Sequence, residues 1–275
     1  MTGSIRGASF GDIEKTFEPA VAVAVDGMFF ASNTGANVDF FDVASVEILR
    51  GPQGTLFGRN TIGGVINVER TRPTGEWGIK ASATVGSYSR HDFKVVANAP
   101  IIKDVLALKR GFFSLNGNSH TRNVDSGIRD DGLDKIAVSG TLLFTPTENF
   151  EALLTVDYTD DDSNYPGILN LSSTDNLICQ AFDQCIETGA DEAAANNFKL
   201  SFNDRPFIAT MKKRAVNLQM KYRFDQFSIE SVTTYMDLDD LLDQENTGSR
   251  RVGGELMFVA IRPQESDQVS QELRV

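Results

Sequence analysis

The sequence predicts a small mixed α+β unit over residues 1–73, followed by antiparallel transmembrane β-strands over residues 74–275. Three observations predict this fold class. In the second region, apolar and polar residues alternate over segments of about ten residues, which is the period of a half-buried strand. The links between these segments are either very short or very long. In the first region, a glycine-rich loop joins two short β-type runs.

The N-terminal unit is predicted from short apolar runs, VAVAV at 21–25, VEIL at 46–49 and VINV at 65–68. Asp26-Gly27 follows the first run, and Asp-Gly is a strong signal for a tight hairpin turn. The loop between the second and third runs holds five of the chain's 23 glycines: Gly51, Gly54, Gly58, Gly63 and Gly64. Because glycine permits positive φ and close backbone approach, we expect tight turns there. TRPTGEW at 71–77 is interpreted as a linker.

Eight strands are predicted in the second region. They lie roughly at 78–87, 92–101, 105–116, 133–145, 150–160, 212–224, 227–238 and 268–275. Within 215–224, one face carries Val216, Leu218, Met220, Tyr222 and Phe224, and the other carries Asn217, Gln219, Lys221 and Arg223. The third strand is imperfect, since Lys109 and Arg110 are adjacent. One of these charges must face the apolar side unless a bulge intervenes.

The connections indicate which kind of β-protein this is. Residues 102–104, 146–149 and 225–226 are tight turns, whereas 117–132, 161–211 and 239–267 are long loops. A loop of about fifty residues is unusual in a compact soluble domain. Tight turns on one edge and long loops on the other are typical of a transmembrane β-barrel. A soluble β-sandwich or lipocalin-like barrel remains the alternative, because alternation does not tell which face meets lipid.

Aromatic residues near strand ends suit an interfacial girdle. They are Tyr158, Tyr222, Phe224, Phe227 and Tyr235.

Composition excludes several classes. The formal net charge of −12 argues against a nucleic-acid partner. No signal peptide is visible in MTGSIRG, and no run of 18 apolar residues could form a transmembrane helix. GPQGTLFGRNT lacks the ending of a phosphate-binding loop, and no catalytic pattern stands out, so we expect neither an enzyme nor a cofactor.

Two side-chain groups leave alternatives open, and we expect no metal site. The acidic run Asp157, Asp160, Asp161 and Asp162 could hold a hard cation such as calcium, but a solvated loop is the favoured interpretation. Cys179 and Cys185 are predicted to form a local disulfide in the longest loop, with two free thiols as the alternative. His91 and His120 are interpreted as surface residues.

Three segments together resemble one known family. SIRGASF at 4–10, VAVDGMFF at 23–30 and VEILRGPQGTLFGRNTIGGVINV at 46–68 resemble, in order and spacing, the plug domain of TonB-dependent outer-membrane receptors. The resemblance covers about residues 4–72, and SQELRV at 270–275 is a weaker sign of the same kind. It implies the C-terminal part of a plug over 1–73 and about eight strands of a 22-stranded barrel over 74–275. The signal peptide, TonB-contacting box and final aromatic strand end of the family are not found here, so we expect a partial receptor.

The resemblance also implies a function and partners. It implies a receptor in the outer membrane of a Gram-negative cell that imports a scarce nutrient, a ferric siderophore being the commonest cargo. Vitamin B12, sugars and aromatic compounds stay open as cargo, and a ligand-sensing signalling receptor is the alternative function. The implied partners are TonB, through a box that would precede this chain, outer-membrane lipid and a small-molecule ligand.

Site residues follow from the same resemblance. Arg6 and Arg50 of the two Arg-Gly segments are expected to lock the plug to carboxylates on later barrel strands, bracing of plug loops being the alternative. Cargo contacts are expected at the plug apex, from Ala8, Ser9, Phe10, Met28, Phe29, Phe30, Asn33, Thr34 and Asn37. Aromatic rings and amides suit an uncharged or chelated ligand. Alternatively, Phe29 and Phe30 fill the plug's own core.

Overall fold

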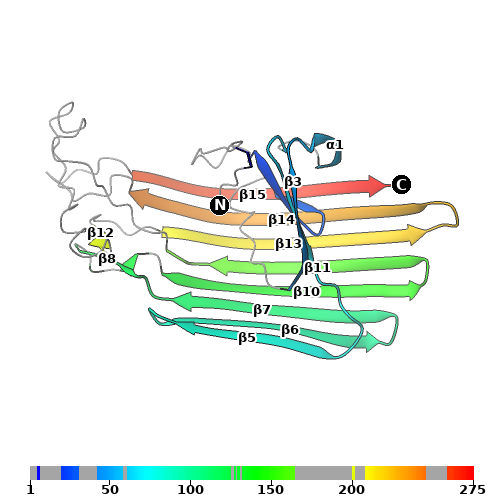
Figure 1. Cartoon of the computed structure of the whole chain (residues 1–275), viewed down its shortest axis with the longest axis horizontal. Coiled ribbons are helices and arrows are strands. Elements are labelled where there is room, and N and C mark those ends of the chain that lie inside the picture. Colours follow the sequence, from blue (N-terminus) through cyan, green and yellow to red (C-terminus); the bar gives the residue numbers. More distant parts are fainter. Residues whose placement is uncertain are drawn as a thin grey trace.

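The computed structural model describes residues 5–6, 20–30, 42–57, 61–124, 127, 129–130, 132–164, 200–201, 208–245 and 259–275. Two main sheets make up this part of the chain (Figure 1). A small sheet of four strands crosses the face of a large sheet of eight strands. A third sheet of short strands, β8 (Thr121–Asn123), β9 (Arg129–Asp130) and β12 (Leu200–Ser201), lies at one end.

The large sheet confirms the eight predicted strands. In chain order they are β5 (Gly78–Gly86), β6 (Arg90–Ile102), β7 (Leu106–Gly117), β10 (Leu133–Thr147), β11 (Phe150–Asp161), β13 (Ile208–Arg223), β14 (Ser228–Glu245) and β15 (Val259–Arg274). Each strand pairs antiparallel with the next, from β5 at one edge to β15 at the other. Within the described residues, the first and last of these strands do not pair with each other.

The predicted placement of the turns is also confirmed. The turns after β6, β10 and β13 all lie at one edge of the large sheet, the right-hand edge in Figure 1, which we call the tight-turn edge. β7, β11 and β14 end at the opposite edge. The turn at 87–89 also lies there, although it is as short as the turns of the tight-turn edge.

The last two strands are longer than the sequence indicated. β14 runs to Glu245, and β15 begins at Val259 instead of residue 268. Near Glu265 and Asp267, both faces of β15 carry polar residues, so the hydrophobic alternation disappears although the backbone pairing continues. Pro263 is tolerated because β15 is an edge strand of this sheet.

The small sheet has the order β2-β1-β4-β3. Its strands are β1 (Val21–Val25), β2 (Met28–Phe30), β3 (Val43–Arg50) and β4 (Gly64–Arg70). β1 and β4 pair in parallel, and the other two pairs are antiparallel. The predicted Asp26-Gly27 turn is present, with φ of 50° and 77°. The expected mixed α+β composition is only partly met, because the one helix in the described part of this unit is α1 (Gly54–Phe57), a single turn.

The glycine-rich loop closes tightly between β3 and β4. The Gly51 N–H donates to the Gly63 carbonyl at 3.0 Å, and the Gly63 N–H donates to Ala20 at 2.9 Å. Gly64 has a φ of +147°, and a Cβ there would lie 2.3 Å from the Leu49 carbonyl oxygen. The loop therefore requires glycine for an approach within the small sheet itself.

The two faces of the large sheet differ in chemistry. The face toward the small sheet carries a cross-strand row of buried polar residues, Lys109, Thr141, Thr155, Asn217 and Thr234. The opposite face, which we call the outward face, exposes apolar side chains, among them Ile79, Phe93, Phe112, Ile136, Val138, Leu142, Val156, Val216, Met220 and Val269. A soluble barrel would turn its apolar face inward, so this arrangement is the one expected of a transmembrane barrel.

The register also answers the question raised by Lys109 and Arg110. Pairing with β6 and β10 is continuous through both residues, without a bulge. Lys109 points toward the small sheet and is buried, whereas Arg110 lies exposed on the outward face. Among the described helices, none has the length and apolar character needed to cross a membrane.

Candidate functional site between the two sheets

The turn of the β1–β2 hairpin is held on the large sheet by side-chain amides. The Asp26 carbonyl accepts hydrogen bonds from Asn217 Nδ2 at 2.7 Å and from Gln219 Nε2 at 2.5 Å. On β15, Gln268 Nε2 donates to the Phe29 carbonyl at 2.6 Å. The hairpin is therefore fixed through its backbone, by residues that alternation had placed on the polar face of the strands.

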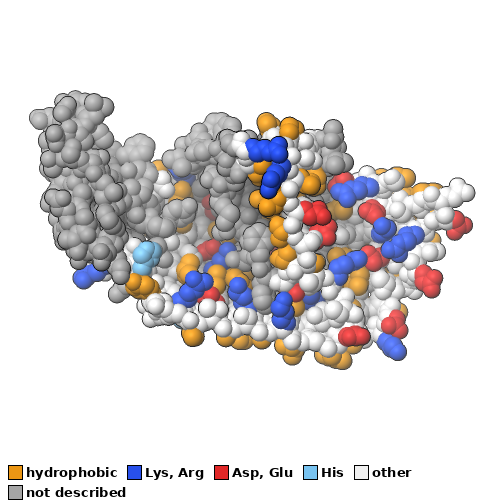
Figure 2. Space-filling view, in the orientation of Figure 1, with side chains coloured by type: hydrophobic (Ala, Val, Ile, Leu, Met, Phe, Trp, Pro, Cys, Tyr) orange, Lys and Arg blue, Asp and Glu red, His pale blue; other side chains and the backbone are white. Residues whose placement is uncertain are grey.

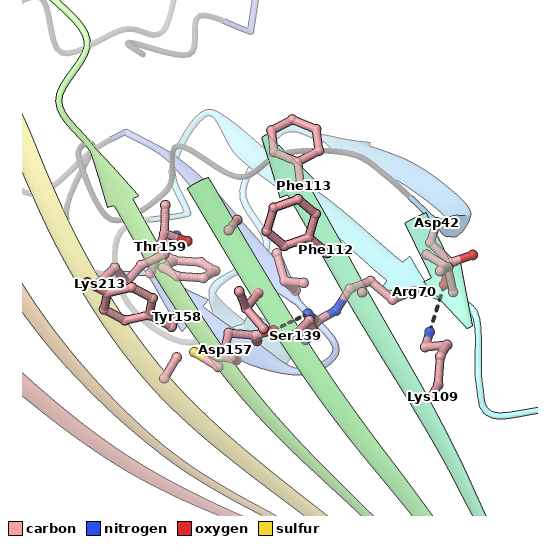
Figure 3. A pocket seen from close by; sticks show the side chains of 18 residues that line it. Asp42, Arg70, Lys109, Phe112, Phe113, Ser139, Asp157, Tyr158, Thr159 and Lys213 are labelled. Atoms are coloured by element: carbon pink, nitrogen blue, oxygen red, sulfur yellow. Dashed lines mark hydrogen bonds and ion pairs between the residues drawn. The ribbon is translucent and has the colours of Figure 1, made fainter. Parts of the chain in front are cut away.

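Arg70 forms a charged bridge between the sheets. It ends β4, and its Nε lies 2.5 Å from Asp26 Oδ2 while its Nη1 lies 2.8 Å from Asp157 Oδ1 on β11 (Figure 3). The Arg70 N–H also donates to Asp26 Oδ1 at 2.8 Å. Burial alone would lower the pKa of Arg70, but the nearby charges of Asp157 and Asp26 and their hydrogen bonds outweigh it and raise that pKa. The guanidinium therefore stays charged and joins one carboxylate of each sheet.

A second bridge starts from the large sheet. Lys109 Nζ lies 2.9 Å from Asp42 Oδ2 and also donates to the Thr71 carbonyl. Both charged side chains are largely buried, at 7% and 12% exposure. A third pair, Arg72 with Glu151 at 2.6 Å, lies nearer solvent. Figure 2 shows acidic and basic side chains interspersed on the face that carries the small sheet.

Between these charged contacts lies a small apolar core shared by both sheets. It contains Val25, Met28, Phe30 and Val68 of the small sheet and Ala215 and Met236 of the large sheet. A cavity of about 120 Å³ adjoins it, bounded on the large-sheet side by residues such as Phe113, Thr159 and Lys213 (Figure 3). Lys213 Nζ lies 5.2 Å from the centre of the Phe30 ring, within range of a cation–π contact.

The predicted lock arginines lie away from these bridges. Arg6 and Arg50 are both exposed, and neither forms an ion pair with a residue of the described part of the chain. The two bridging cations observed, Arg70 and Lys109, were not singled out as locks by sequence reasoning. Two signals were available in the sequence. Asp157 alternates onto the polar face of its strand, and Lys109 and Arg110 are adjacent, so one of them had to lie on that polar face.

The predicted cargo contacts are only partly described. Met28 and Phe30 are buried in the shared core, at 2% and 4% exposure, and Phe29 is half-buried. For Phe30 the packing role left open by the sequence is therefore the one observed, whereas Met28, expected only as a cargo contact, packs in the same core. The remaining predicted contacts lie outside the described residues: Ala8, Ser9, Phe10, Asn33, Thr34 and Asn37.

The other predicted features fall as follows. Gly51, Gly54, Gly63 and Gly64 belong to the closed loop, and Gly58 lies outside the described residues, as do Cys179 and Cys185. The acidic run divides between the two faces of β11, since Asp157 and Asp161 point toward the small-sheet side and pair with Arg70 and Lys135, while Asp160 accepts from Tyr158 on the outward face. The predicted aromatic girdle is met in part: Tyr222, Phe224 and Phe227 are in ring contact at the tight-turn edge, whereas Tyr158 and Tyr235 lie further along β11 and β14.

Comparison with known proteins supports the family resemblance. Residues 2–65 match the TonB-dependent Receptor Plug Domain. The pesticin receptor of Yersinia pestis is 44% identical over 72 residues, which are 26% of this chain and 10% of that receptor. The ferrioxamine receptor of Yersinia enterocolitica is 25% identical over 166 residues, 59% of this chain and 21% of that receptor. The chain thus spans only a small part of the length of these relatives.

Solved structures share the fold beyond the matched domain. The ferric yersiniabactin uptake receptor FyuA from Yersinia pestis superposes with a TM-score of 0.73 at 20% identity, covering 98% of this chain and 38% of that chain. The siderophore receptor PiuA from Acinetobacter baumannii gives 0.70 at 13% identity, covering 99% and 38%. Residues 2–65 therefore match the plug domain of TonB-dependent receptors, and the eight antiparallel strands that follow share the fold of such a receptor's barrel.

Proposed function

We propose that this chain is part of an outer-membrane receptor that imports a ferric siderophore by TonB-coupled rearrangement of its plug. The proposal rests on one observation: the small sheet contacts the large sheet mainly through polar and charged side chains. Arg70, Lys109, Asn217, Gln219 and Gln268 make the contacts, and the shared apolar core is small. The location is the outer membrane of a Gram-negative cell, where the exposed apolar outward face meets lipid.

A polar interface between the two sheets suits a plug that must stay in place and later move. The net contribution of one hydrogen bond is only about 0.5–1.5 kcal/mol, because water replaces the lost partner. A lumen that admits water can therefore take over the contacts of Asn217 and Gln219 one at a time as the plug shifts. A large apolar interface would resist the same movement, since each Å² of apolar surface that becomes exposed to water costs about 25 cal/mol.

The division of the chain follows the resemblance. Residues 1–73 form the C-terminal part of the plug, and residues 74–275 form about eight strands of a 22-stranded barrel. Arg6 and Arg50 lock the plug to carboxylates on barrel strands beyond these eight. That proposal is supported by the exposure of both arginines, which leaves them available to such partners.

Cargo class is supported by the relatives. Besides the pesticin receptor, those matched include a ferrioxamine receptor and a catecholate siderophore receptor, and the solved neighbours include a ferric yersiniabactin uptake receptor. We place cargo contacts in segments 8–10 and 33–37 at the plug apex, with Phe29 beside them and Met28 and Phe30 supporting the segment from the core. A Cys179–Cys185 disulfide shapes the longest external loop.

Uptake experiments on the full-length receptor test the proposal. The receptor gene is deleted and restored, and radioactive iron uptake is measured with hydroxamate, catecholate and phenolate siderophores. Uptake of at least one complex should require both the receptor and TonB, while binding of the same complex to isolated membranes should not require TonB. Uptake of vitamin B12 or a sugar in place of every iron complex would contradict the cargo. A ligand response confined to gene expression, without uptake, would favour the signalling receptor.

A further inference from the structure

We propose that Arg110 binds the phosphate of an anionic phospholipid in the membrane leaflet at the tight-turn edge. This inference goes beyond import and depends only on the membrane location of the sheet. It begins with the continuous register of β7, which directs Lys109 inward and Arg110 outward. Lys109 has its partner in Asp42, but Arg110 is exposed and forms no ion pair within the described residues.

The surroundings of Arg110 on the outward face are apolar and small. Its direct cross-strand partners are Ala97 on β6 and Gly140 on β10, and a Cβ added at Gly140 would meet no atom within 4 Å. Along its own strand the outward neighbours are Leu108 and Phe112. The guanidinium therefore has room to turn, and the only outward carboxylate described on an adjacent strand, Asp134 of β10, lies six residues along from Gly140.

The nearest described outward acid lies well away. Asp160 pairs with Ile136, four residues from Gly140 along β10, which corresponds to about 13 Å at about 3.4 Å per residue. By contrast, the outward-facing Arg214 has Asp237 at 3.1 Å, directly across the strand pair. Of these two outward arginines, Arg214 has a carboxylate partner in the sheet, whereas Arg110 has none within the described residues.

The depth of Arg110 in the membrane indicates which leaflet supplies the phosphate. Leu106 begins β7 at the tight-turn edge, opposite Phe144, whose ring contacts Phe150 in the aromatic cluster of that edge. Aromatic rings of this kind mark the membrane–water interface. Arg110 lies about 13 Å further along the strand, or about 10 Å deeper for a strand tilted by about 40°. The long arginine side chain can cover much of this depth while its stem packs on apolar surface.

Energetics favours a phosphate partner. A charged arginine facing lipid costs about 2–4 kcal/mol at the midplane and about 0–1 kcal/mol near the interface. A guanidinium reaching back to the headgroups moves toward the lower cost, and its planar fork matches two phosphate oxygens. The small neighbours Ala97 and Gly140 leave room for the side chain to turn, and its stem can then lie along Leu108 toward the tight-turn edge.

The test uses the full-length receptor purified from outer membranes, with phosphatidylglycerol as the probe. Retention of phosphatidylglycerol through detergent washing is measured by native mass spectrometry. R110Q should lose most of the retained lipid. R214Q should retain as much as the wild type, because Arg214 is already satisfied by Asp237. R110K keeps the charge without the fork and should fall between the two.

Three outcomes overturn the proposal. The first is equal retention of phosphatidylglycerol by R110Q and the wild type. The second is a loss in R214Q as large as in R110Q, which would indicate a general effect of charge. The third comes from a parallel arm with lipid A, where loss of lipid A alone in R110Q would place the phosphate in the opposite leaflet. If R110Q does not assemble, R110K decides, and full retention by R110K would overturn the pairing.

Discussion

The small sheet and the large sheet use the same apolar residue types, but the small sheet buries them and the large sheet exposes them on its outward face. β1 is a run of valine and alanine buried between its neighbours, as in a soluble protein. The large sheet places Val138, Val156 and Val216 on its exposed face and polar residues against the small sheet. The difference teaches that each sheet follows its own surroundings, which the proposed function takes to be a water-filled lumen for the small sheet and lipid for the outward face of the large sheet. A substitution should therefore have opposite consequences in the two regions.

The largest effect is expected inside the small sheet. In G64A, a Cβ would lie 2.3 Å from the Leu49 carbonyl and 2.8 Å from Ile5 Cδ1, so the backbone must move. We expect a loss of roughly 3 kcal/mol or more in the stability of the small sheet, while the large sheet stays assembled. Limited proteolysis of the full-length receptor in membranes measures both. G51A is the control, because φ is +90° there but no atom lies within 4 Å. Equal protease resistance of the two variants would contradict the expectation.

The next effect is expected on the outward face of the large sheet. V156R places a charge on a surface where Val156 is 49% exposed between Gly140 and Val216. The expected cost is about 2–4 kcal/mol if this face meets lipid. The fraction of folded receptor in unheated gel samples reports it, and V156L serves as the apolar control. Normal assembly of V156R would mean that this face meets water.

A smaller effect is expected at the junction between the sheets. R70L leaves Asp26 and Asp157 without their shared cation, at an expected cost of about 1–3 kcal/mol to the seating of the small sheet. R72L removes an ion pair whose arginine is 49% exposed, so its cost should stay within about 1 kcal/mol. Hydrogen exchange of residues 64–70 compares the two variants. Faster exchange in R72L than in R70L would show that the buried bridge is not the anchor.

The smallest effect is expected from removing one side-chain amide of the large sheet. N217A removes one of two donors to the Asp26 carbonyl, and Gln219 still donates to it. We expect about 0.5–1.5 kcal/mol, seen as slightly faster exchange at the Asp26-Gly27 turn. The double variant N217A/Q219A should lose more than the sum, since the carbonyl then has neither donor. Strict additivity would indicate that water replaces the amides without loss.

Much of the fold could be predicted because alternation and turn chemistry are local signals. The eight strands, the Asp26-Gly27 hairpin and the common edge of the tight turns follow from residues close in sequence. The first part of β15 was not predicted, because around Glu265 neither face is apolar and periodicity vanishes. Backbone pairing with β14 extends β15 beyond the segment in which its outward face is apolar.

The site was less accessible to sequence reasoning. Arg70 meets Asp26 and Asp157 across 44 and 87 residues of sequence, and no local pattern joins such positions. The glycine-rich loop drew attention to Arg50, whose surroundings in the described chain hold no partner. The composition of MFFASNTGAN suggested a ligand surface, yet Met28 and Phe30 are core residues. Residue type indicated the right segment there but could not indicate the direction of each side chain.

The pairing of β1 has a mechanical consequence. β1 and β4 are parallel, and β4 ends at Arg70, which is tied to the large sheet. A tension that draws Val21 away along the strand while Arg70 holds would load the whole β1–β4 register in shear, so its hydrogen bonds would resist together. On the other side, β1 and β2 are antiparallel, and Phe30 is the far end of the hairpin. That pair has three register positions, Val23–Phe30 to Val25–Met28, against five in the β1–β4 pair, so fewer backbone hydrogen bonds oppose the same tension there. The small sheet is thus mechanically graded, because the β1–β4 pair opposes such a tension with more hydrogen bonds loaded together than the β1–β2 pair does.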